Sequence, residues 1–190
     1  TRRSSDLCVV NIDSVIGANS RLPVFYTKIV YTFSSNGVEV SIHAEKNALL
    51  KAMNRSSSEE TNLDIHLKTE IDEIPRFAMR FALLPEFESL EYFGKGDREC
   101  YIDYQEHAKM GVWESTVSKE YEPYIVPQEC GNHMNVTDIK VSSSDNEFSV
   151  NSNTPLEFSA LHYKMEDLDA AKHTFELPKI NSTEVIVAYK

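Results

Sequence analysis

The chain has 190 residues, of which 41% are hydrophobic and 26% charged, an ordinary composition for a globular protein. This length suits one large domain, so we expect residues 1–190 to form a single domain. The net charge of -11 speaks against nucleic acid or an acidic membrane as a partner. We also expect no membrane span and no signal peptide, because the chain has neither a long apolar run nor a typical leader pattern.

The first half of the chain predicts strands. Residues 24–33 are rich in β-branched and aromatic side chains, and residues 38–44 alternate apolar and polar. Asn36-Gly37 between them can supply the positive φ of a hairpin turn. The polar stretch 47–62 predicts an exposed loop, and alternation over 63–74 predicts another strand.

The second half continues this pattern with almost no helix. We expect further strands over residues 77–84, 89–93, 111–118, 139–141, 147–150, 158–163 and 185–189. Residues 165–172 form the best helical candidate, since their apolar side chains recur every three or four residues. Trp113 lies on an expected strand, so we place it in the core and do not assign it as a sugar platform. Many short strands favour an all-β fold, a large antiparallel β-sandwich with at most one short helix.

The three cysteines, Cys8, Cys100 and Cys130, are an odd number without a C-x-x-C pair. They therefore predict free thiols in a reducing compartment. Neither this spacing nor the histidines, which lack an H-x-x-x-H pair, predicts a metal site.

The densest cluster of loop-forming and aromatic residues is the stretch 81–133. It contains four of the six glycines, five of the nine tyrosines and the only tryptophan. Glycine shapes backbone, and tyrosine offers an apolar face with a polar edge, so we expect the functional loops here.

Two ordered motifs in this stretch carry a resemblance. The first is residues 92–96, YFGKG, followed by Glu99, Tyr101 and Asp103; the second is residues 124–132, YIVPQECGN. They resemble the pattern Y-x-G-x-G-P-x-E-x-Y-x-D followed by Y-x-x-P-Q-E-N-G in the last domain of family-two glycoside hydrolases, the long, lacZ-type β-galactosidases. Asp97 stands where that pattern has Pro, and Cys130 where it has Asn.

The resemblance implies a galactose mutarotase-like supersandwich, of which this chain is a fragment truncated at both ends. It implies a C-terminal accessory domain that walls the sugar site of a β-galactosidase, an enzyme that hydrolyses terminal β-D-galactosides such as lactose. It implies no catalytic residue in this chain, because the family's carboxylate pair belongs to a separate barrel domain. The substrate-pocket rim would be formed by Tyr92, Gly94, Gly96, Glu99, Tyr101, Asp103, Gln128, Glu129 and Asn132.

The resemblance also sets expectations about cofactors and partners. This chain would hold no cofactor, and the parent enzyme would bind magnesium and sodium mostly through other domains. Its partners would be the catalytic barrel of the same enzyme and a β-galactoside, within a homo-oligomer. The expected location is the bacterial cytoplasm, with the periplasm as the alternative.

Several alternatives remain open at this stage. Glu99, Asp103 and Glu129 are expected to brace loops by accepting backbone and tyrosine hydrogen bonds, in preference to direct sugar contact. A different function would be an autonomous carbohydrate-binding module that exposes Tyr92, Tyr101, Tyr104, Tyr121 and Tyr124. Two further alternatives are the small subunit of a two-chain β-galactosidase and a structural sandwich used in adhesion.

Overall fold

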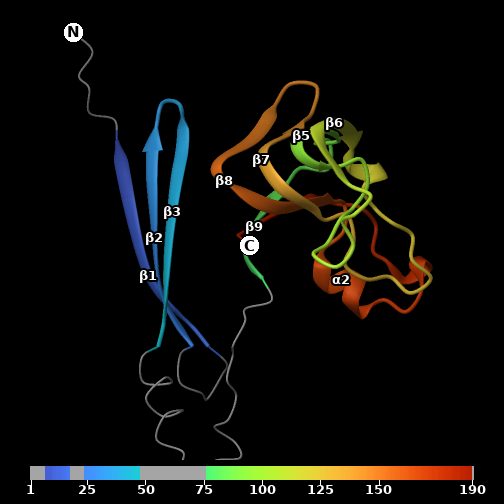
Figure 1. Cartoon of the computed structure of the whole chain (residues 1–190), viewed down its shortest axis with the longest axis horizontal. Helices are drawn as coiled ribbons and strands as arrows, with labels where there is room; N and C mark the ends of the chain where they lie inside the picture. Colours follow the sequence, from blue (N-terminus) through green and yellow to red (C-terminus); the bar gives the residue numbers. More distant parts are fainter. Residues whose placement is uncertain (1–6, 18–23, 48–75, 190) are drawn as a thin grey trace, which may run out of the picture. The chain divides into compact units, whose positions relative to one another are not determined.

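The computed structural model describes residues 7–17, 24–47 and 76–189. The chain divides into two compact units, Thr1–Glu73 and Ile74–Lys190, and each contains one antiparallel sheet (Figure 1). The expected all-β class is confirmed, because the described residues form nine strands and a single short α-helix, consistent with a β-sandwich. That residues 1–190 form one domain stays a prediction. Within the described ranges, no helix is long and apolar enough to cross a membrane.

The first unit is a three-stranded sheet. Its strands, in spatial order, are β1 (Cys8–Ile16), β2 (Phe25–Ser34) and β3 (Gly37–Lys46). The register places Ile12, Ile29 and Ile42 side by side, so one face is apolar and the other mostly polar. The hairpin predicted between residues 24–33 and 38–44 is confirmed, and Gly37 takes a φ of +135°. Strand β1 was not expected from the sequence.

The second unit is a six-stranded sheet with the order β4-β9-β8-β7-β5-β6. Its strands are β4 (Phe77–Leu83), β5 (Ser89–Gly96), β6 (Lys109–Thr116), β7 (His133–Ser142), β8 (Glu147–Leu161) and β9 (Thr183–Tyr189). Separate strands were expected at 147–150 and 158–163, but β8 runs through both. Pro155 is tolerated because no ladder pair forms between Asn151 and Leu156 in this described stretch.

One face of this sheet carries the core. Its fully buried side chains include Leu90, Tyr92, Val117, Val136, Ile139, Val141, Phe158 and Val185. Trp113 packs against this cluster, and its indole N–H donates to the Gly94 carbonyl at 3.1 Å. The core placement of Trp113 is therefore confirmed.

Short helices complete the second unit. The predicted helix is confirmed as α2 (Met165–Ala170), which buries Leu168 against Cys130 and Leu161. Burying one leucine stabilises the fold by about 1.5–3 kcal/mol. Two 3₁₀ turns are also present, η2 (Val117–Lys119) and η3 (Thr174–Glu176). The strand predicted at 63–74 lies outside the described residues, as does nearly all of the predicted loop 47–62.

Candidate functional site

The two motif loops leave the same end of the six-stranded sheet. The loop 97–108 connects β5 to β6, and the loop 120–132 leads into β7, which runs antiparallel to β5. They are joined directly: the Cys100 amide donates to the Asn132 carbonyl at 2.6 Å, and the Asn132 side-chain amide donates to the Cys100 carbonyl at 2.9 Å. The structure therefore brings together two motifs that are about thirty residues apart in the chain.

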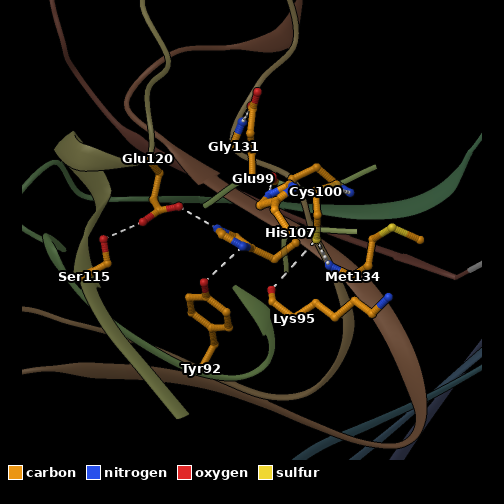
Figure 2. A network of polar contacts seen from close by, with 11 residues as sticks. Tyr92, Lys95, Glu99, Cys100, His107, Ser115, Glu120, Gly131 and Met134 are labelled. Atoms are coloured by element: carbon orange, nitrogen blue, oxygen red, sulfur yellow. Dashed lines mark hydrogen bonds and ion pairs between the residues drawn. The ribbon is translucent and has the colours of Figure 1, made fainter. Parts of the chain in front are cut away.

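Glu99 is the main brace between these loops. Its carboxylate accepts hydrogen bonds from the Tyr124 hydroxyl and from the Gly131 amide, the latter at 2.7 Å. Its own carbonyl lies 3.1 Å from His107 Nε2 (Figure 2). The Glu99 carboxylate raises the pKa of Tyr124 well above its ordinary value, because it accepts the phenolic hydrogen. The bracing role expected for Glu99 is confirmed.

A buried chain of polar groups lies beneath the loops (Figure 2). The Tyr92 hydroxyl donates to His133 Nδ1 at 3.0 Å, and His133 Nε2–H donates to the Glu120 carboxylate at 2.6 Å. The Ser115 hydroxyl donates to the other oxygen of Glu120. Burial, reinforced by Glu120, raises the pKa of Tyr92 above its ordinary value. Tyr92, His133 and Glu120 are almost fully buried, so this network holds β5, β6 and β7 together and does not face solvent.

The motif glycines are required by close packing. A Cβ added to Gly94 would lie 2.5 Å from Val136 Cγ2 and 3.1 Å from its Cα. A Cβ on Gly96 would lie 2.4 Å from the Tyr92 hydroxyl, and one on Gly131 would lie 2.6 Å from the Glu120 carbonyl. Gly131 also takes a φ of +69°, which favours glycine. These glycines let the strands and loops approach each other closely.

The remaining predicted rim residues are spread over the same end of the sheet. Glu129 forms an ion pair with Arg76, so its partner is neither a backbone amide nor a tyrosine as expected. Asp103 and Gln128 are exposed, whereas Asn132 is buried. Tyr101 is half-buried, and its buried hydroxyl has no hydrogen-bond partner among the residues that the structure describes. Membership of a sugar-pocket rim stays a prediction for all nine residues.

The five tyrosines considered for a carbohydrate-binding face do not share one exposed surface. Tyr92 is only 2% exposed and belongs to the core, whereas Tyr104 is 55% exposed. Tyr101, Tyr121 and Tyr124 are half-buried. Tyr92 therefore cannot serve as a stacking platform, because its ring contacts His133 and Phe158.

Sequence reasoning missed two groups of residues here. The first is the set His133, Glu120 and Ser115, in which His133 bonds to Tyr92, 41 residues away, and to Glu120, 13 residues away. The second is an aliphatic set at the loop tips: Ile102, Ile125 and Val126, which are 70%, 95% and 56% exposed. The Ile125-Val126 pair inside the second motif could have been noticed, since a loop rarely places two aliphatic side chains together without burying them.

The chemistry open to this site is limited by its hydrogen bonding. The Glu99 and Glu120 carboxylates each accept two hydrogen bonds and are engaged in structure. Over the residues that the structure describes, no three His, Cys, Asp or Glu side chains gather to hold a metal ion. That the parent enzyme binds magnesium and sodium mostly through other domains stays a prediction. The arrangement is suited to holding two loops rigidly.

Comparison with known proteins agrees with the motifs. A family model described as the β-galactosidase small chain matches residues 2–190. Similar proteins include the β-galactosidase of Actinobacillus pleuropneumoniae, 34% identical over 122 residues, and that of Streptococcus thermophilus, 35% identical over 123 residues. The matches cover 64% and 63% of this chain but only 12% of each relative. The β-galactosidase BgaC of Bifidobacterium adolescentis is 36% identical over 114 residues, which are 58% of this chain and 11% of that protein. The chain belongs to the β-galactosidase small-chain family.

Proposed function

We propose that this chain acts as the C-terminal accessory domain of a β-galactosidase, packing against the catalytic part through its two motif loops and forming one wall of the galactoside pocket. Support comes from the relatives, which carry the name β-galactosidase and are about eight times longer than the matched region. A segment of this size supplies a domain and leaves the remaining machinery to the rest of the polypeptide.

One observation carries this proposal: apolar loop tips stand on rigidly held loop bases. Ile125 is 95% exposed although the loop bearing it is tied to Glu99 through Tyr124 and Gly131. Ile102, from the other loop, is 70% exposed. Exposed aliphatic side chains on two loops that are bonded to each other favour a protein interface. Loops that are already ordered lose little conformational entropy when they dock.

The role of this domain in hydrolysis would be structural. A retaining glycosidase needs two free carboxyl groups about 5–5.5 Å apart. Glu99 and Glu120 do not meet this requirement, because each is engaged by two donors within the domain. The catalytic pair would come from the rest of the enzyme. This domain would exclude water from the pocket, and Asp103 and Gln128, which are exposed, could bind sugar hydroxyls at its rim.

The test is association with the rest of a related enzyme. The Streptococcus thermophilus β-galactosidase, shortened by the region that this chain matches, is mixed with the chain, and binding is followed by titration calorimetry. We expect a complex, weakened at least about tenfold by Ile125→Asp because a charge would be buried in the interface. The matched control is Ile180→Asp, at an isoleucine 49% exposed outside the loops, which should bind like the unmodified chain. No association, or equal loss with both variants, would contradict the proposal.

A further inference from the structure

A groove lies on the face of the six-stranded sheet that is opposite to the core. It has a volume of about 400 Å³ and crosses strands β6, β5, β7 and β8. The register lines up its central row: Val112 pairs with Phe93, Phe93 pairs with Asp138, and Asp138 pairs with Asn151. Phe93 is three residues before Gly96, where the first motif loop begins, and the rest of the groove extends away from that loop. Tyr92, which also borders the groove, points its ring into the core on the other face, and no other lining residue belongs to the candidate site.

One half of the groove is apolar. Phe93 is 41% exposed and Val112 is 67% exposed, and they are direct cross-strand neighbours. Their side chains alternate with Tyr92 and Trp113, which point to the core on the other face. An exposed phenyl face beside an aliphatic side chain offers a flat apolar platform. Such a platform suits the C–H face of a pyranose ring.

The other half of the groove is polar and its side chains are held in place. Asp138 accepts a hydrogen bond from the Asn151 side-chain amide at 2.8 Å and one from the Thr137 hydroxyl at 2.6 Å. A carboxylate has about four acceptor positions, so Asp138 can still accept hydrogen bonds from a ligand. In the adjacent row, Lys140 Nζ lies 3.3 Å from Glu91 Oε1, and the remaining N–H groups of this ammonium can donate to a ligand. The polar side chains can thus both donate to and accept from vicinal hydroxyls.

The charged side chains that line the groove limit which ligands it can bind. Three carboxylates line the groove, from Glu91, Asp138 and Glu147, against the single ammonium of Lys140. An anionic ligand would be repelled by this excess of negative charge. The volume falls within the range of small-molecule sites and is sufficient for one or two sugar rings. We propose that this groove is a second saccharide site, which binds a neutral pyranoside by stacking on Phe93 and hydrogen bonding to Asp138 and Lys140.

The groove is open on one side, so binding should be weak, with a Kd of about 10 mM. This inference goes beyond the proposed function and does not depend on it, because it concerns the chain alone and a different face. The test follows amide chemical shifts of the ¹⁵N-labelled 190-residue chain during titration with methyl β-D-galactopyranoside and methyl β-D-glucopyranoside. We expect saturable shifts at Phe93, Val112, Asp138 and Lys140, and no comparable shifts in the motif loops.

Two variants and two charged probes sharpen this test. Phe93→Ala should weaken binding at least about tenfold through lost stacking. The matched control is Phe175→Ala, at a phenylalanine 83% exposed outside the groove, which should leave the Kd unchanged. Glucuronate should bind more weakly than either neutral sugar. The proposal is overturned if no groove amide shifts at about 100 mM sugar. It is equally overturned if the shifts lie only in the motif loops, or if glucuronate or lysine methyl ester binds better than the neutral sugars.

Discussion

Replacing Glu99 with alanine tests whether one carboxylate holds the two motif loops together. The substitution leaves the buried Gly131 amide without an acceptor, which costs about 1–3 kcal/mol. It also removes the hydrogen bond from the half-buried Tyr124 hydroxyl, worth about 1 kcal/mol. We therefore expect Glu99→Ala to lower the free energy of unfolding of the second unit by about 3 kcal/mol.

The matched control is Glu99→Gln, which keeps the shape of the side chain. The glutamine oxygen can accept from the Gly131 amide, and its NH₂ group can donate to the Tyr124 oxygen, so both contacts survive without the charge. The expected loss is about 1 kcal/mol. The free energy of unfolding of both variants is measured by guanidinium unfolding, followed by the fluorescence of Trp113. This is the only tryptophan of the chain, and it lies in the second unit, as Glu99 does. If alanine costs less than about 1 kcal/mol, or glutamine costs as much as alanine, Glu99 is not the brace that its contacts indicate.

Three further predictions address packing, pH and thiol chemistry. Gly94→Ala should lower the free energy of unfolding by about 2–3 kcal/mol, because the added Cβ would overlap Val136 on the neighbouring strand. Gly111→Ala is the control: its added Cβ would make ordinary contacts at 3.4 Å, so the free energy of unfolding should change by less than about 1 kcal/mol. Burial opposes ionisation of Glu88, but hydrogen bonds from His162 and Ser118 outweigh it and lower the pKa of Glu88 in the folded chain. The ionised carboxylate therefore stabilises the fold above its unfolded pKa of 4.5, and this stabilisation is lost as the pH falls through the folded pKa. The urea midpoint should consequently fall less between neutral and acid pH for Glu88→Gln than for the unmodified chain. Ellman's reagent should react quickly with exposed Cys8 in the native chain, and with buried Cys100 and Cys130 only after unfolding. Burial raises the pKa of Cys130 to about 11, so little of its reactive thiolate is present. Fast reaction of all three thiols in the native chain would contradict the structure.

Local patterns predicted most of the strands, because alternation of apolar and polar side chains depends only on which face is buried. These patterns failed at strands β1 and β8, where the local sequence does not alternate cleanly. Strand β1 has Ile12 on the apolar face and Asp13 on the polar face, but Val9 and Val15 interrupt the polar face and obscure the alternation. Two separate strands were expected at 147–150 and 158–163, yet β8 continues between them and tolerates Pro155 where no ladder pair forms.

The candidate site was predictable at the level of its loops but not of its contacts. Glycines and tyrosines in the two motifs indicated shaped loops, and the pairing of Glu99 with Gly131 fits that expectation. The buried network could not be read from local sequence, because His133 lies 41 residues from Tyr92 and 13 from Glu120. Those distances close only when β5 and β7 pair and the intervening loop folds back.

The claim that this chain is one wall of a β-galactosidase pocket is tested most directly by hydrolysis of a chromogenic β-galactoside. The assay compares the isolated chain, the Streptococcus thermophilus enzyme lacking the region that this chain matches, and a fusion of the two. The account predicts turnover by the fusion and none by the isolated chain. Hydrolysis by the purified 190-residue chain alone would contradict it, since the catalytic carboxylates would then have to lie within this chain.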